Sequence, residues 1–188
     1  MCRVQPGILK KKAIHLLAHT TSPSLYVDLL VEVGEDLFKV KPTYAESAIA
    51  GYRWCVGISD QWFIDQVVLP TVRDHVVCLY YSRWPDGYNV VGPLMDVKWS
   101  DIFQNHFEYQ IGDERSSAIF KFDHEADGVI SFISGFTTLT TGDLISLGSV
   151  VAGKPLKVFP LNITLHFRDL SWSVNIAYTD KYERMTNL

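Results

Sequence analysis

Residues 129–149 read VISFISGFTTLTTGDLISLGS, and this stretch decides the fold class because helix and strand signals follow each other closely. Its apolar residues recur first at helical spacing, which predicts a helix over residues 128–138. Residues 141–143 then mark a turn, and the apolar residues 144–147 predict a strand that ends at Gly148. The stretch therefore indicates a domain that combines helix and sheet.

Strand patterns dominate the chain on both sides of this stretch. Apolar or alternating runs predict strands over residues 25–33, 53–59, 76–82, 157–166 and 171–178. Residues 107–111 and 117–122 alternate around a Gly-Asp turn, which predicts a β-hairpin. A second helix is predicted over residues 43–49, and residues 99–110 fit either a helix or a strand. We expect an α+β domain that is rich in strands and has few helices.

The length and composition fit one folded domain. The chain has 188 residues, of which 47% are hydrophobic and 20% are charged, and this composition excludes intrinsic disorder. We expect a single domain over residues 1–188, with an irregular N-terminal segment over 1–24, a core over 25–180 and a polar tail over 181–188. The net charge of −4 argues against nucleic acid or an anionic membrane as a partner.

Targeting signals and cysteine usage indicate the cell compartment. No apolar run approaches the roughly 18 residues of a membrane span, and the N-terminus lacks the features of a secretory signal. The cysteines Cys2, Cys55 and Cys78 are an odd number without paired spacing, which is typical of reduced thiols. We therefore expect a cytoplasmic protein.

Four segments, in the same order along the chain, resemble motifs of the fumarylacetoacetate hydrolase superfamily. Residues 26–34 resemble its "E-x-E-Φ-x-Φ-Φ-Φ-G" strand, and residues 49–61 resemble "IAGYT-x-x-ND-Φ-S-x-R". Residues 86–94 resemble "K-x-x-D-x-x-x-P-Φ-GP", and residues 129–149 resemble a helix followed by "TL-x-x-GD-ΦΦ-x-x-G-[TS]". The resemblance covers residues 25–178.

This resemblance implies a rolled, mixed β-structure around a deep polar pocket. Members of the superfamily hydrolyse, decarboxylate, hydrate or tautomerise β-diketo and enol acids. They usually hold Mg²⁺ or Mn²⁺ on three carboxylates, where a hard dication stabilises the enolate that forms.

The chain departs from the family pattern at the metal-binding positions. The three carboxylates of the family fall, in order, on Tyr26, Asp28 and Gly57. The family's lysine, its paired aspartate and its arginine fall on Asp86, Asn89 and Gln61. Only Asp28 keeps a carboxylate, so we expect no cofactor. Binding of Mg²⁺ or Mn²⁺ stays an alternative, and its possible oxygen ligands would be Asp28, Glu32 and Asp60.

The resemblance also assigns roles to individual residues. Asp28 would be a general base, and Tyr26 and Asn89 would orient a carbonyl oxygen. Arg83, if it lines the pocket, would pair with an anionic group of the substrate. Further substrate-binding residues would be Gly148, Ser149, Asp60 and Gln61.

Three functions are compatible with these observations. The first is a diverged enzyme without the metal triad, which acts on an oxygen-rich carbonyl or enol intermediate, for example of secondary metabolism, by a lyase, isomerase or cyclase step. The second is a non-catalytic subunit that binds a small molecule or regulates a partner through a vestigial site. The third is a hydrolase or decarboxylase that depends on Mg²⁺ or Mn²⁺. The partner in the first case is a small carbonyl compound, and the resemblance implies a homodimer.

Overall fold

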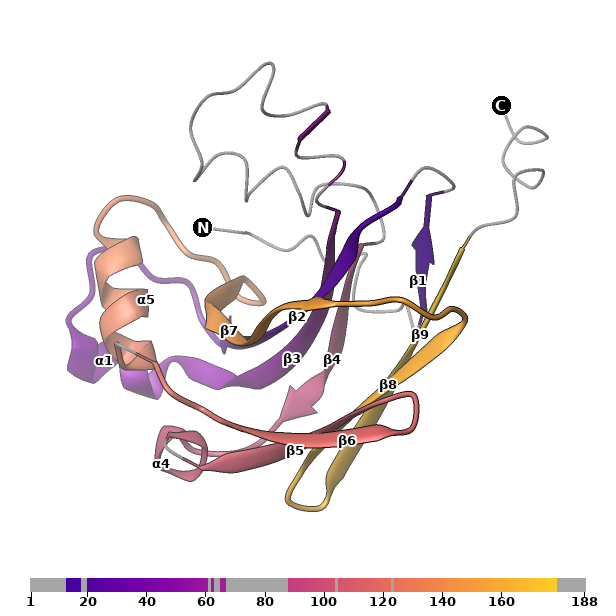
Figure 1. Cartoon of the computed structure of the whole chain (residues 1–188). Helices are drawn as coiled ribbons and strands as arrows, with labels where there is room; N and C mark the ends of the chain where they lie inside the picture. The colour runs from indigo at the N-terminus through magenta and orange to yellow at the C-terminus, as the bar shows by residue number, and fades with distance from the viewer. Residues whose placement is uncertain are drawn as a thin grey trace.

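In the computed structural model, two β-sheets lie face to face and carry a helical region at one end (Figure 1). The structure describes residues 13–17, 20–60, 62, 65–66, 88–103, 105–122 and 124–178.

The first sheet has four antiparallel strands in the order β4-β3-β2-β7. Their bounds are β4 Asn89–Met95, β3 Ile49–Asp60, β2 Pro23–Val33 and β7 Leu144–Pro155. The central pair, β2 and β3, keeps one regular register from Pro23 opposite Asp60 to Glu32 opposite Gly51. This regular register fixes which side chains share each face of the sheet.

The second sheet has five strands in the order β1-β9-β8-β5-β6. Their bounds are β1 Ala13–Leu16, β9 Leu170–Tyr178, β8 Leu161–Phe167, β5 His106–Ile111 and β6 Glu114–Ile119. The short β1 pairs with β9 in parallel, whereas the other pairs are antiparallel, so this sheet is mixed.

The sheets approach each other at two seams. Strand β4 lies near β9 and β1, and β6 lies near β7. At the second seam, Lys154 Nζ of β7 binds Glu114 Oε1 of β6 at 2.8 Å. The result is the rolled, mixed β-structure that the family resemblance implies.

The hydrophobic core lies between the two sheets. On β2, alternation turns Val27, Leu29 and Val31 toward it, and all three are fully buried. Trp54 of β3 packs with its ring centroid 4.8 Å from that of Phe107 on β5. Burial of a large apolar side chain contributes about 1.5–3 kcal/mol, so this layer supplies much of the stability.

Two helices lie side by side at one end of the four-stranded sheet (Figure 1). They are α1, Pro42–Ser47, and α5, Ala126–Ser134. Ser131 Oγ donates to the carbonyl of Val40 at 2.7 Å, and the Val40 N–H donates to Ser134 Oγ at 3.2 Å. A third short helix, α4, covers Trp99–Ile102. No helix in the described ranges has the length and apolar character that a membrane crossing requires.

The α+β, β-rich fold class is confirmed, and so is the β5–β6 hairpin. The helix predicted over residues 128–138 begins and ends earlier, as α5. The strand predicted to end at Gly148 continues to Pro155, because Gly148 adopts a φ of 127° that lets the strand bend without stopping. The ambiguous residues 99–110 contain both structures, α4 followed by the start of β5.

The N-terminal segment differs from the irregular structure expected over residues 1–24. Residues 13–16 form β1, and β2 already begins at Pro23. Ile14 and Leu16 of β1 are fully buried, so apolar burial against β9 gives this segment its order. The strand predicted over residues 76–82 and the tail over residues 181–188 lie outside the described residues.

Candidate functional site

The site lies on the second face of the four-stranded sheet, away from the core. Alternation along β2 puts Tyr26, Asp28, Leu30 and Glu32 on this face, as the sequence predicts. Asp28 stands opposite Cys55 of β3 and Ser149 of β7. Asp28 therefore lies in the middle of the sheet, with a strand on either side.

The Asp28 carboxylate is held by a hydroxyl from the neighbouring strand. Ser149 Oγ donates to Asp28 Oδ1 at 2.5 Å, and Asp28 is only 7% exposed. A hydroxyl that donates to a buried carboxylate stabilises its charged form and fixes its orientation. The structure thus brings together two residues that were predicted for the site from distant parts of the sequence.

Gly57 stands at the position of the family's third carboxylate, and residues of the two adjacent strands flank it. Tyr26 of β2 stands opposite Gly57 of β3, and Gly57 stands opposite Asn89 of β4. A Cβ added at Gly57 would lie 2.7 Å from Asn89 Oδ1. The Asn89 amide therefore takes the space into which a side chain at position 57 would project.

The Tyr26 phenol extends toward the other edge of the sheet. A Cβ added at Gly153 of β7 would lie 3.6 Å from the Tyr26 hydroxyl oxygen. Tyr26, Asn89 and Ser149 therefore supply a phenol, an amide and a hydroxyl on the face that carries Asp28.

Glu32 is engaged in an ion pair, which sequence reasoning did not anticipate. Arg53 Nε donates to Glu32 Oε2, and Arg53 Nη1 donates to the carbonyl of Gly92 at 3.0 Å. The two side chains are only 15% and 18% exposed. One signal was available: Arg53 and Glu32 are opposite charges on adjacent predicted strands, and a half-buried acid needs such a partner.

Asp60 does not join this site, although the sequence suggested it as a ligand or substrate-binding residue. The regular alternation of β3 puts Asp60 on the face of Ile58 and Trp54, which is the core side. Its Oδ1 accepts the N–H groups of Ser22 and Trp62 at 3.4 and 3.1 Å, and the residue is 1% exposed. Asp60 follows Gly57 by three positions, and an odd offset along a strand already predicts opposite faces.

Gly148 lies beside the site but does not offer the free N–H that a substrate carbonyl would need. Its N–H donates to Ser146 Oγ at 3.2 Å, and Gly148 stands opposite Leu29. The predicted residues Arg83 and Gln61, and the family's lysine position Asp86, lie outside the described residues.

An apolar patch adjoins the polar groups. Leu30, Cys55, Val91 and Leu144 form a small cluster of their own, and all four are buried. The face therefore combines a polar centre around Asp28 with a hydrophobic flank. Cys55 belongs to this flank, as expected for a packed thiol.

The donors on this face do not match the metal site of the family. Nowhere in the described part of the chain do three or more His, Cys, Asp or Glu side chains form a group that could hold a metal ion. Among the residues that the structure describes, Asp28 is the only acid in the polar centre, because Glu32 pairs with Arg53 and Asp60 lies on the other face. A phenol and an amide are poor substitutes for carboxylates toward Mg²⁺, which requires near-octahedral oxygen ligands.

Comparison with known proteins shows the fold. No family sequence model and no curated protein sequence matches the chain. Among solved structures, it is similar to 5-carboxymethyl-2-hydroxymuconate delta-isomerase from Mycobacterium smegmatis, with a TM-score of 0.70 and 18% identity over 90% of this chain and 64% of that chain. A Yersinia pestis CO92 protein assigned to the fumarylacetoacetate hydrolase family has a TM-score of 0.71 and 17% identity over 87% of this chain and 77% of that chain.

The chain is also similar in structure to a second mycobacterial isomerase. The 2-hydroxyhepta-2,4-diene-1,7-dioate isomerase from Mycobacterium marinum has a TM-score of 0.69 and 18% identity over 90% of this chain and 64% of that chain. The chain thus spans less than two thirds of the length of both mycobacterial isomerases. It has the fold of the fumarylacetoacetate hydrolase superfamily, which the sequence motifs had indicated.

Proposed function

We propose that the chain is a diverged enzyme of fumarylacetoacetate hydrolase type that abstracts a proton next to a carbonyl group without a metal ion. The observation that carries this proposal is the polar centre around Asp28. A decayed site would fill with apolar side chains, whereas this face keeps a carboxylate, a hydroxyl, a phenol and an amide together.

Asp28 is the general base in this proposal. It takes a proton from the carbon next to the carbonyl, and the bonding electrons move onto the carbonyl oxygen to give an enolate. Returning the proton to another carbon of a conjugated enolate would give an isomerase. If the enolate electrons instead form a C=C bond and expel a hydroxyl group from the next carbon as water, with the proton held by Asp28, the reaction would be that of a lyase. The hydrogen bond from Ser149 orients the Asp28 carboxylate for this proton transfer.

Tyr26, on the β7 side of Asp28, and Asn89, on the β4 side, are the two donors available to stabilise the enolate oxygen. The phenol and the amide are hydrogen-bond donors on the face of Asp28, and a fixed donor contributes about 3 kcal/mol to such an oxyanion. The apolar flank of Leu30 and Val91 excludes water and so strengthens these hydrogen bonds. We further propose a small carbonyl compound as the partner, a homodimer as the assembly and the cytoplasm as the compartment.

Exchange of carbon-bound hydrogen tests the proposal without knowledge of the final product. Pyruvate and oxaloacetate are incubated in D₂O with the protein and EDTA, and NMR follows the loss of their C–H signals. We expect catalysed exchange that falls by about 10²–10⁴-fold in Asp28→Asn, because the isosteric amide cannot accept the proton. Tyr26→Phe should cost about tenfold, because one hydrogen bond is lost.

Asp113→Asn is the matched control, because Asp113 is an exposed acid in the β5–β6 turn. Full exchange in Asp28→Asn would reject the catalytic role. Exchange that EDTA abolishes would favour the metal-dependent alternative. Binding of these acids without any exchange would favour the non-catalytic subunit.

A further inference from the structure

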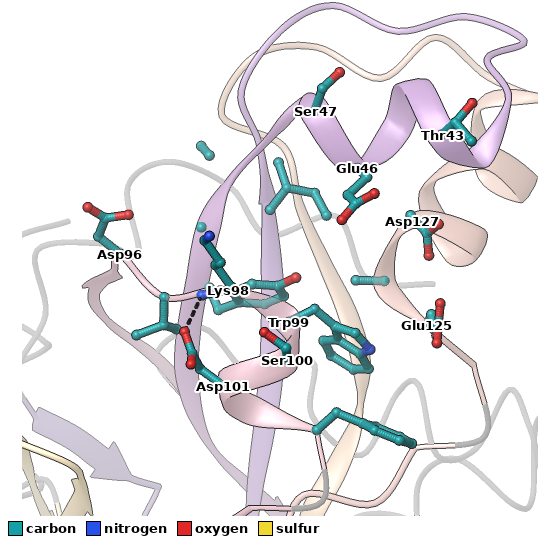
Figure 2. A pocket seen from close by; sticks show the side chains of 17 residues that line it. Thr43, Glu46, Ser47, Asp96, Lys98, Trp99, Ser100, Asp101, Glu125 and Asp127 are labelled. Carbon is teal, nitrogen blue, oxygen red and sulfur yellow. Dashed lines mark hydrogen bonds between the residues drawn. The ribbon is translucent and has the colours of Figure 1, made fainter.

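A pocket lies away from Asp28, between the helices and the start of β3 (Figure 2). Its volume is about 1040 Å³, and its walls come from α1, the first residues of β3, the segment from Asp96 to Phe103 and the beginning of α5. None of the residues assigned to the first site lines it. Pockets that bind small molecules commonly have volumes of about 300–1,000 Å³, so this one can hold a small organic ligand.

The wall of this pocket is strongly acidic. Its five acids are Glu46, Asp96, Asp101, Glu125 and Asp127, and Lys98 is the one basic residue among the lining residues. The negative charge of Asp101 is compensated by Arg168, whose Nη2 donates to Asp101 Oδ1 at 2.8 Å. This hydrogen bond holds the pKa of the Asp101 carboxyl below its usual range. Glu46, Asp127 and Glu125 remain as a negative group on the helical side (Figure 2).

The floor of the pocket is aromatic. The ring centroids of Tyr52 and Trp99 lie 5.9 Å apart, and those of Trp99 and Phe103 lie 5.7 Å apart. Burial raises the pKa of the Tyr52 hydroxyl, and the carboxylates of Asp127 and Glu46 raise it further. The negative potential therefore reaches the aromatic floor, where a ring face also attracts cations.

Trp99 adds an independent sign of a missing partner. Its Nε1 is a buried donor without an acceptor in the part of the chain that the structure describes. Figure 2 shows the indole nitrogen on the side of the ring that faces Glu125. A buried N–H that lacks a partner destabilises the structure, and an acceptor on a bound ligand would relieve that cost.

We propose that this pocket binds a small organic cation, an ammonium compound with a hydrogen-bond acceptor next to its charged group. Glu46 and Asp127 bind the ammonium group, the Trp99 ring contacts it, and Trp99 Nε1 donates to the acceptor. A metal ion fits less well, because no three acidic or metal-ligating side chains of the described residues stand close enough to share one ion. This proposal does not depend on the function of the Asp28 site.

Three probes separate charge from hydrogen bonding. Ethanolamine carries the cation and an acceptor, ethylamine carries the cation alone, and ethylene glycol carries hydroxyls without charge. Ligand-observed NMR titrations of the full chain should show that ethanolamine binds best, ethylamine several-fold more weakly, and ethylene glycol at least about tenfold more weakly.

Two variants locate the binding. Glu46→Gln with Asp127→Asn should weaken ethanolamine binding about tenfold, whereas Asp113→Asn outside the pocket should leave it unchanged. Trp99→Phe keeps an aromatic ring and removes the N–H, so it should erase the preference of ethanolamine over ethylamine. Equal binding of ethylene glycol, no binding of ethanolamine, or an unchanged preference in a folded Trp99→Phe variant would each overturn the proposal.

Discussion

At the scale of single residues, the hydrogen bond between Ser149 and Asp28 is the contact on which the polar centre depends. Ser149→Ala removes the donor and leaves the buried carboxylate with less stabilisation, so we expect a loss of about 1–3 kcal/mol in the free energy of unfolding. Urea denaturation measures this loss. Ser149→Thr keeps a hydroxyl and should recover most of it.

Ser173→Ala is the control for this experiment. Ser173 shares a hydrogen bond with Thr164 at 2.9 Å, but both lie on an exposed strand surface. Its loss should stay within about 0.5 kcal/mol. If Ser149→Ala and Ser173→Ala have the same small effect, the Ser149–Asp28 contact does not organise the site.

A second prediction at this scale concerns the pair Gly57 and Asn89. Gly57→Ala places a Cβ at 2.7 Å from Asn89 Oδ1, so the amide must turn away, at an expected cost of about 1–3 kcal/mol. In an Asn89→Ala background the same substitution should be nearly neutral, because the space is free. A double-mutant cycle measures the coupling, and additive effects would show that the amide does not occupy this space.

At the scale of secondary structure elements, two glycines in the α5–β7 region isolate the effect of backbone conformation. A Cβ at Gly128 or at Gly142 would meet no atom within 4 Å, so packing does not distinguish them. Gly142 has a φ of 84°, whereas Gly128 lies inside α5. We expect Gly142→Ala to destabilise the protein by about 1–2 kcal/mol and Gly128→Ala to stabilise it by about 0.5–1 kcal/mol.

Thermal unfolding of both variants checks this prediction. Opposite shifts in melting temperature are expected although both substitutions add the same methyl group. Shifts of the same sign would mean that the Gly142 turn, whose N–H donates to the carbonyl of Val33 at 2.8 Å, does not require the left-handed conformation.

The elements that could be predicted from the sequence are those whose signals are local. Alternation and turn residues are short-range, so the strand around Asp28 was predicted with nearly its observed bounds. The hairpin around Gly112 was also predicted, but its second strand begins and ends three residues earlier than expected, at Glu114 and Ile119. The extension of β7 beyond Gly148 depends on pairing with β2, which no local pattern contains. The order of β1 likewise depends on distant β9.

The site was predicted in part for the same reason. The face of Asp28 follows from alternation, and its meeting with Ser149 followed from the family resemblance. The Arg53–Glu32 pair needs the register of β2 against β3, because Arg53 stands opposite Leu30 and reaches diagonally to Glu32. Asp60 was assigned to the site because it is close to Gly57 along the chain. Its odd offset of three positions puts it on the other face of the strand.

At the scale of the whole molecule, the two candidate sites lie in different surroundings. The Asp28 centre lies on the outer face of the four-stranded sheet, and the acidic pocket lies where that sheet meets the helices. Their separation means that a ligand at one site and a reaction at the other can be measured independently. It also allows a single measurement on the folded chain to tell which site takes a metal, if either does.

That measurement is the melting temperature in the presence of Mg²⁺ or Mn²⁺. A site with a dissociation constant of about 10 µM would stabilise the fold by ~2.7 kcal/mol at 1 mM metal. For a chain of this length, that corresponds to a rise of roughly 5–10 °C. Because Asp28 is the one acid that the described residues contribute to the polar centre, we expect a rise of no more than about 1–2 °C, which is typical of millimolar binding. A large rise that disappears in Asp28→Ala would restore the metal-dependent enzyme. A large rise that persists in Asp28→Ala and disappears in Glu46→Gln with Asp127→Asn would instead make the acidic pocket a metal site and refute the organic cation.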